Sequence, residues 1–224
     1  MTGTMPAEPE IKWSRLAAFV RQHTHDVRNG LNSLDLETAL LFEIVADSEG
    51  RECIQRQREQ VRAIGAQMRE LAARFQNPKP ILAPLAARDL FLIWEDQQAD
   101  LPKPLAVQWV DELGTEQVNV DAGMMANAFR ELLENAAAFS EGGTMTASAR
   151  CEGDEVIFDL REPKTGALDP SAWGEPLATT RRGGYGLGLW SARRLLVANH
   201  ARIEQRHVAS EGALLTRIFL PVCK

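Results

Sequence analysis

A histidine, an adjacent acid and an amide one helical turn further on lie near the start of the chain, at His25, Asp26 and Asn29. A histidine acts as a nucleophile when one ring nitrogen keeps an exposed lone pair and a carboxylate binds the N–H of the other. Asp26 is placed to bind His25 in this way and to act as general base. Asn29 shares the helical face of His25, where its amide can orient a water or a transferring phosphoryl group. This combination favours a nucleophilic histidine over an ordinary surface one.

The segment around His25 is predicted to be the first helix of a helical hairpin. Apolar residues recur three and four positions apart before and after the segment Asp47–Gly50, which we expect to be the turn. Such spacing forms a narrow seam of coiled-coil type, with His23 on the seam and His25 facing solvent. A single hairpin buries only one seam, so we expect a four-helix bundle in a homodimer. The alternative is that the seam packs on the rest of the chain.

The heptapeptide His25-Asp26-Val27-Arg28-Asn29-Gly30-Leu31 resembles the H-box of two-component sensor histidine kinases, His-Glu/Asp-x-Arg-Asn-Pro-Leu. Six of the seven positions fit, and Gly30 replaces the proline. Both residues loosen a helix just after the active turn. The resemblance implies that His25 is the phosphoacceptor and that the hairpin is a dimerisation and histidine-phosphotransfer domain.

A second motif of the same family is matched by the helical segment Glu131–Ser140, which resembles its N-box. The resemblance implies that Asn135 binds the Mg²⁺ that bridges the phosphates of ATP. Mg²⁺ commonly takes few protein ligands beside those phosphates. Glu131 stands one turn earlier, where a carboxylate can hydrogen-bond a metal-bound water or polarise the attacking histidine. Without the other motifs, this would be an ordinary amphipathic helix with Glu131 and Asn135 on its wet face.

A glycine-rich segment that runs into a helix, 173–189, is the strongest signal in the chain. Glycines let backbone N–H groups approach phosphate oxygens, and a helix N-terminus adds a positive dipole. The segment resembles the F-box and G2-box of the histidine kinases. The resemblance implies nucleotide contacts from Thr179, Thr180, Gly184, Gly186, Leu187 and Gly188, and a lid cation at Arg181, which stands where the family has lysine.

The motif that reads adenine in this family, Asp-x-Gly-x-Gly after a strand, is altered here. Two acids compete for the aspartate position, Asp159 and Glu162. We match Glu162, because it shares the inward parity of the strand 156–160 and because Gly166 follows four residues later. Lys164 then replaces the first glycine and brings a long side chain where the backbone would approach the nucleotide. We therefore expect weakened ATP binding.

The elements expected around these motifs define the fold class as α+β. The paired prolines at 78 and 80 end the helical region, which gives a hairpin domain at residues 10–77 and an ATP-binding domain at residues 80–224. In the second domain we expect strands at 107–111 and 117–121, a helix at 122–139, a hairpin at 144–162, a helix at 187–199 and a hairpin at 201–221. Strands and helices mix without a βαβ repeat, which predicts an α/β sandwich of histidine-kinase type.

Composition excludes several other classes. The chain has 224 residues, 45% hydrophobic and 25% charged, with a net charge of -6, so we expect no nucleic-acid partner. No apolar run is long enough for a membrane span, no secretory signal begins the chain, and its three cysteines fit no zinc or disulfide spacing. These features predict a cytoplasmic protein. The two domains fill the length, so we expect input from a separate sensor protein or from the cytosol, or a role as a relay only.

The resemblance implies a kinase that autophosphorylates His25 from ATP with Mg²⁺ and passes the phosphoryl group to an aspartate of a response-regulator receiver domain. Asn29 can also support the reverse, phosphatase, activity. The altered adenine motif keeps an alternative open, a dimeric histidine phosphotransferase with a degenerate ATP domain. A third class, a related ATPase or serine kinase, is disfavoured by the histidine-bearing helix.

Overall fold

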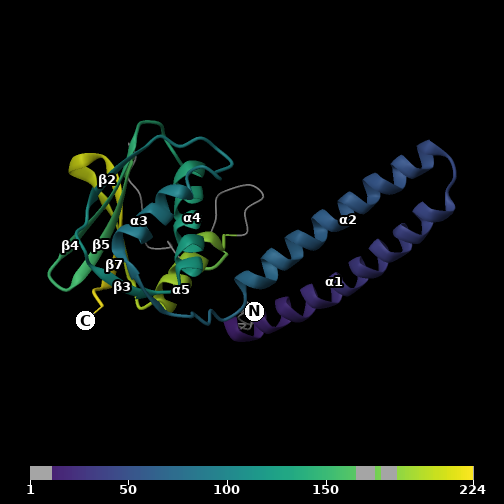
Figure 1. Ribbon diagram of the computed structural model, residues 1–224, viewed down its shortest axis with the longest axis horizontal. Helices are drawn as coiled ribbons and strands as arrows, with labels where there is room; N and C mark the ends of the chain where they lie inside the picture. The colour runs from purple at the N-terminus through teal and green to yellow at the C-terminus, as the bar shows by residue number, and fades with distance from the viewer. Residues whose placement is uncertain (1–11, 165–174, 178–185, 224) are drawn as a thin grey trace, which may run out of the picture. The chain divides into compact units, whose positions relative to one another are not determined.

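The computed structural model describes residues 12–164, 175–177 and 186–223. The chain divides into two compact units, Met1–Asn77 and Pro78–Lys224. The first unit is a helical hairpin and the second is built from β-strands and shorter helices (Figure 1). The predicted α+β class, a hairpin followed by an α/β sandwich, is confirmed.

Two long helices, α1 (Trp13–Ile44) and α2 (Ser48–Arg74), pack side by side in the hairpin. Asp47 accepts a hydrogen bond from the backbone N–H of Gly50 at 2.6 Å and so caps α2. Ser48, Glu49 and Gly50 therefore belong to the first turn of α2, and the prediction that they form the connection is wrong. The connection is shorter, residues 45–47, because the cap at Asp47 starts the second helix earlier.

The face of α1 that packs on α2 includes Ala17 and Thr24, both buried. The Thr24 hydroxyl donates to the carbonyl of Val20, which satisfies its polar group within the helix. His23 is exposed and stacks on Phe19 instead, with ring centroids 5.8 Å apart. Within one hairpin His23 is therefore not buried between α1 and α2, and its packing in the seam of a four-helix bundle stays a prediction. Asp35 links the helices through Arg58 and Arg62 of α2, each at 3.4 Å.

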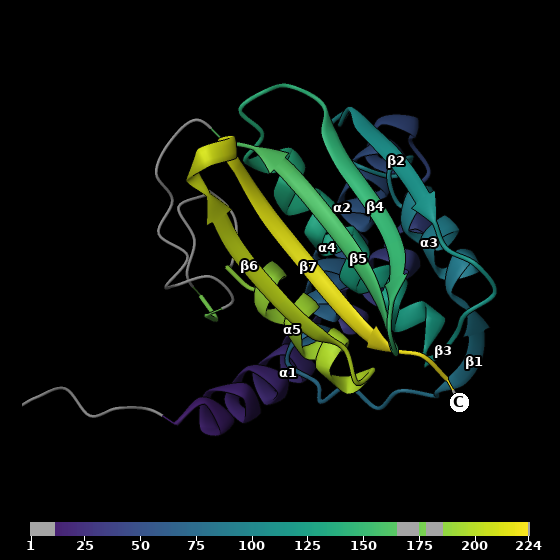
Figure 2. The ribbon, with the colours of Figure 1, turned by 90° about the vertical axis from the view of Figure 1, so that its left-hand side faces the viewer.

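The described part of the second unit contains two sheets. Strands β1 (Ala83–Ala86) and β3 (Gln117–Val120) form an antiparallel pair. The larger sheet has the order β2-β4-β5-β7-β6, in which only the β2/β4 pair is parallel. Its strands, visible face-on in Figure 2, are β2 (Val107–Glu112), β4 (Met145–Glu152), β5 (Glu155–Pro163), β6 (Arg202–Val208) and β7 (Ala213–Pro221).

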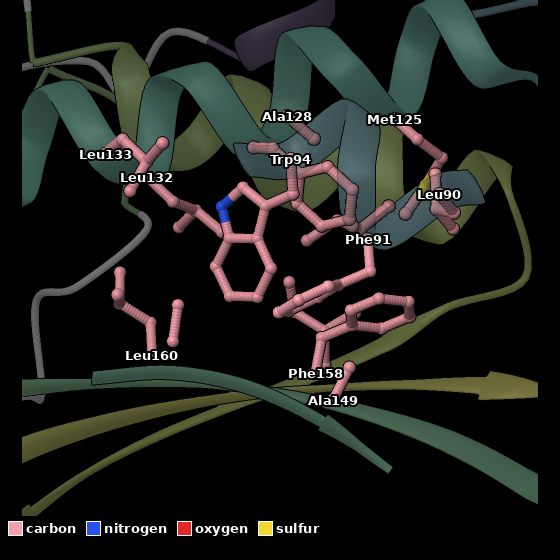
Figure 3. Packing of buried hydrophobic residues seen from close by; sticks show 14 of the residues in the cluster. Leu90, Phe91, Trp94, Met125, Ala128, Leu132, Leu133, Ala149, Phe158 and Leu160 are labelled. Atoms are coloured by element: carbon pink, nitrogen blue, oxygen red, sulfur yellow. The ribbon is translucent and has the colours of Figure 1, made fainter. Parts of the chain in front are cut away.

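Three helices cover one face of this sheet: α3 (Ala87–Asp96), α4 (Ala122–Ala138) and α5 (Gly188–Ala198). A short 3-10 helix, η2 (Ala209–Glu211), connects β6 to β7. Figure 3 shows the core between helices and sheet, where Trp94 of α3 lies among side chains from α4 and β5. The rings of Trp94 and Phe129 stack with centroids 4.9 Å apart, and Phe158 of β5 meets both.

The helices α4 and α5 pack against each other, and polar side chains fix their ends. Asp121 caps α4 by accepting from the backbone N–H of Met124 at 3.0 Å. The backbone N–H of Asp121 donates in turn to Oδ1 of Asn199, the C-cap residue of α5, at 2.6 Å. The buried side chain of Asn199 thus joins the start of α4 to the end of α5, and this sets how the two helices present their residues.

Candidate functional site

His25 and Asp26 lie on an exposed part of α1, and their side chains retain 54% and 59% of their accessible surface. The Nδ1 atom of His25 lies 3.3 Å from Oδ1 of Asp26. If Nδ1 carries the proton, it donates to the carboxylate and Nε2 keeps its lone pair. The geometry therefore suits the sequence prediction of a nucleophilic imidazole oriented by its neighbouring acid.

The carboxylate of Asp26 is itself held by a residue that the sequence analysis did not single out. The side-chain amide of Gln22 donates to Oδ1 of Asp26 at 2.9 Å. This hydrogen bond, followed by that of His25, holds the pKa of Asp26 below its ordinary value. The sequence spacing could have indicated this contact, because residues 22 and 26 are one helical turn apart.

Asn29 approaches the same ring nitrogen from the next turn of α1. Its Nδ2 atom lies 3.4 Å from Nδ1 of His25. The amide of Asn29 can donate only to an unprotonated Nδ1, whereas Asp26 accepts only from a protonated one. The two neighbours therefore favour opposite tautomers of His25, and the structure brings together the three residues predicted to act here.

Glu131 and Asn135 occupy successive turns of α4, both partly exposed. The opposite face of the helix is buried in the core through Met125, Phe129 and Leu132. Glu131 lies against Gly188, the first residue of α5, where a Cβ atom added to the glycine would be 2.8 Å from its Oε2. A carboxylate at a helix N-terminus is electrostatically favourable. Sequence-distant residues of the two predicted nucleotide motifs thus meet here.

The glycine-rich segment is described in part. Gly186 has φ of 63°, in the left-handed region that glycine adopts without strain, and its carbonyl accepts from the backbone N–H of Leu177 at 2.9 Å. Leu187 is buried beside the start of α5. The predicted site residues Gly166, Thr179, Thr180, Arg181 and Gly184 lie outside the described residues.

The two acids that competed for the adenine-reading position lie on opposite faces of β5. Asp159 faces away from the helices, where it accepts from Arg150 at 2.7 Å and from Arg217 at 2.7 and 2.9 Å. Glu162 is buried and pairs with Lys164, whose Nζ lies 3.5 Å from its Oε2. The lysine side chain therefore turns inward, toward Glu162.

A residue with an exposed aromatic side chain contacts this pair through its main chain, and the sequence analysis did not select it. Phe139, the C-cap residue of α4, is 42% exposed, and its carbonyl accepts from Nζ of Lys164. An exposed aromatic face can stack on a nucleobase.

Within residues 12–164, 175–177 and 186–223, no three histidine, cysteine or acidic side chains gather to hold a metal unaided. None of the helices in those ranges is both long and apolar enough to traverse a bilayer.

Comparisons with known proteins extend the resemblance from motifs to the chain. No protein-family profile matches it. It is 29% identical over 211 residues to the alginate biosynthesis sensor protein KinB of Pseudomonas aeruginosa, which covers 87% of this chain. The chain spans about a third of that relative's length, 35%.

Solved structures of histidine kinases have the same fold. Full-length ShkA, crystallised in complex with AMPPNP, gives a TM-score of 0.66 at 18% identity, covering 93% of this chain and 46% of ShkA. A solved structure of the histidine kinase AdeS of Acinetobacter baumannii gives 0.52 at 16% identity, covering 89% of this chain and 98% of the chain in that structure. A solved structure of the mycobacterial sensor histidine kinase MprB gives 0.51 at 16% identity, covering 63% of this chain and 98% of the chain in that structure. The resemblance to the catalytic core of sensor histidine kinases is therefore confirmed.

Proposed function

We propose that this chain is an ATP-dependent protein-histidine kinase of a two-component phosphorelay. The observation that carries the proposal is the arrangement of His25, with Asp26 at 3.3 Å on Nδ1 and the ring exposed on α1. In the proposed step, the Nε2 lone pair of His25 forms an N–P bond to the γ-phosphorus of ATP. The bond from that phosphorus to the bridging oxygen breaks, and ADP leaves with the electron pair. Asp26 stabilises the positive imidazole and accepts its Nδ1 proton.

The nucleotide is assigned to the second unit, between α4 and the start of α5. Asn135 and Glu131 provide amide and carboxylate oxygens on one partly exposed face of α4, which fits the hard oxygen ligands that Mg²⁺ prefers. In this assignment Asn135 would hold the metal ion, and Glu131 would hydrogen-bond a water beside it. A bound Mg²⁺ would neutralise phosphate charge. The backbone of Gly186, Leu187 and Gly188 enters the N-terminus of α5, where N–H groups can meet phosphate oxygens.

The phosphoryl group is proposed to pass from His25 to an aspartate of a response-regulator receiver domain. We further propose that the chain acts in the cytoplasm and that a separate sensor protein supplies its input. A homodimer is favoured by the hairpin itself. Leu34 and Leu41 of the apolar seam are 47% and 48% exposed within one hairpin. Pairing two hairpins would bury these side chains.

Autophosphorylation with ATP labelled in the γ-phosphate tests the proposal. Acid-labile label should appear on the purified chain with Mg²⁺ and be lost in His25→Gln. The matched control is His23→Gln, a neighbouring exposed histidine on the same helix that should retain labelling. Label that persists in His25→Gln would refute the site. If the chain without substitutions takes up no label, the kinase activity is refuted.

A second candidate function is a dimeric histidine phosphotransferase that does not bind nucleotide. The observation in its favour is that Glu162, matched to the adenine-reading acid, is engaged by Lys164. Titration calorimetry with Mg·ATP separates the candidates. Heat of binding supports the kinase, whereas no heat together with phosphotransfer from a phosphorylated receiver domain supports the relay module.

A further inference from the structure

The end of β5 carries a buried ion pair that none of the proposed steps uses. The side chains of Glu162 and Lys164 each retain only 4% of their accessible surface, with Nζ and Oε2 3.5 Å apart. The same Nζ donates to the carbonyl of Phe139 at the C-terminal end of α4. Lys164 therefore connects β5 to α4 and has two acceptors inside the domain.

The main chain at Lys164 is held as firmly as its side chain. Its backbone N–H donates to the carbonyl of Gly212, in the turn before β7, at 2.7 Å. Gly212 has φ of 53°, and a Cβ atom there would lie 3.3 Å from the carbonyl oxygen of Lys164. Turning the lysine side chain outward would separate a buried charge from both acceptors, while the main chain stays held to Gly212.

The two charges depend on each other. Burial raises the pKa of Glu162, and the adjacent Lys164 ammonium opposes that rise. Removing one partner of a buried pair leaves the other charge uncompensated, which is far more costly than removing both. The carboxylate of Glu162 therefore has a structural partner that it cannot exchange for a ligand without loss.

The neighbouring acid on β5 offers no substitute. Asp159 faces the opposite side of the sheet and is bound by Arg150 and Arg217. A free carboxylate beside a purine favours adenine, because it accepts from the amino group of adenine and repels the carbonyl oxygen that guanine carries in its place. Both acids of β5 are engaged by cations. Neither is therefore free to attract the amino group of adenine or to repel the carbonyl oxygen of guanine.

We propose that Glu162 and Lys164 form an internal structural ion pair in place of a base-reading carboxylate, so that this domain binds purine nucleoside triphosphates with little discrimination between adenine and guanine. The nucleotide part of this inference rests on the proposed function. Affinity then comes from the phosphates and their metal, and from stacking that any purine can provide.

A double-mutant cycle tests the ion pair without any nucleotide. The variants Glu162→Gln, Lys164→Met and their combination are compared by thermal unfolding of the full chain. Each single change should lower the Tm by about 10 °C, and the double change should cost clearly less than their sum. The control is Glu155→Gln, also on β5, whose ion pair with Arg202 is about half exposed and should contribute little. Additive losses would overturn the proposal.

Base selectivity is measured on the same proteins by calorimetry with Mg·ATP and Mg·GTP. We expect the two dissociation constants to agree within about tenfold, because a site that hydrogen-bonds one base rejects the other by far more. The ratio of the two dissociation constants should also stay the same in Glu162→Gln. Because both constants are measured on the same protein, a partial loss of folded protein does not change their ratio. An ATP preference above tenfold, or one that Glu162→Gln abolishes, would overturn the proposal. If neither nucleotide binds, the proposed kinase and the base-tolerant site both fail, whereas coupling in the cycle still upholds the internal ion pair.

Discussion

Glu131 of α4 and Gly188 of α5 approach so closely that a Cβ atom on Gly188 would lie 2.8 Å from Oε2 of Glu131. The contact places a carboxylate at the N-terminus of α5, next to the turn of α4 that carries Asn135. It joins two motifs that are more than fifty residues apart in the chain, so a substitution in one motif should alter the position of side chains in the other.

We predict that Gly188→Ala weakens nucleotide binding while leaving stability almost unchanged. The atom that must move is the end of a flexible side chain, so the free energy of unfolding should change by less than about 1 kcal/mol. The displaced carboxylate should lower Mg·ATP affinity about tenfold, measured by calorimetry. The control is Gly65→Ala in α2, where the added methyl meets only Arg69 at 3.6 Å. Undiminished affinity in Gly188→Ala would exclude Glu131 from the site.

The pair of His25 and Asp26 leads to a prediction about rate. Asp26→Asn should slow autophosphorylation about a hundredfold or more, because the amide cannot accept the Nδ1 proton. Gln22→Ala should slow it less, since the carboxylate remains but loses the hydrogen bond that orients it. A matched control exists on α2, where Gln55 donates to Glu59 at 3.1 Å with the same spacing. A Gln55→Ala rate as low as that of Gln22→Ala would mean that Gln22 acts through helix stability alone.

Asn29 should affect the reverse reaction more than the forward one. It competes with Asp26 for Nδ1 of His25 and can donate only when that nitrogen lacks a proton. Asn29→Ala should therefore retain autophosphorylation at or above the original rate. Dephosphorylation of a phosphorylated receiver domain should fall about tenfold or more. Nitrogen NMR of the histidine ring gives an independent readout, because the variant should shift the tautomer population toward Nδ1–H.

Asp121 provides a prediction about acid stability. Backbone N–H groups, first of Ile81 and then of Met124, hold the pKa of Asp121 below its ordinary value of 3.8. A carboxylate with a lowered pKa stabilises the fold above its unfolded-state pKa, and this contribution is lost as the pH falls through its folded-state pKa. Asp121→Ala should cost about 1 kcal/mol at pH 7, and the deficit should shrink below pH 3.8. Urea unfolding at several pH values measures both.

The variant Asp121→Asn is the control for that pH dependence. It keeps an N-cap acceptor for α4 but cannot titrate, so its stability relative to Asp121→Ala should not change between pH 7 and pH 3. A deficit of Asp121→Ala that stays constant with pH would show that the lowered pKa makes no contribution to stability.

Periodicity predicted most of the fold, because the helices and strands of the second unit bury one face and expose the other. The strand β1 and helix α3 were not predicted. Pro84 lies within β1, and proline is unusual inside a strand. Helix α3 is short, so its apolar residues Phe91 and Trp94 form no repeat long enough to indicate a helix. The sequence also did not reveal that Lys164 turns inward. That direction depends on Glu162 and the Phe139 carbonyl, which only the folded domain brings together.

The exposed leucines of α1 provide a test of the homodimer. Leu34 and Leu41 are seven residues apart and so lie on one stripe of the helix, about half exposed within a single hairpin. Introducing charge by Leu34→Glu or Leu41→Glu should convert a dimer to a monomer, with the molecular mass followed by analytical ultracentrifugation. Leu40→Glu is the control, because Leu40 is 59% exposed on a different face of α1 and lies outside the stripe. If all three variants remain dimeric, the second hairpin packs elsewhere. If Leu40→Glu alone dissociates, the interface uses the face of α1 that carries Leu40.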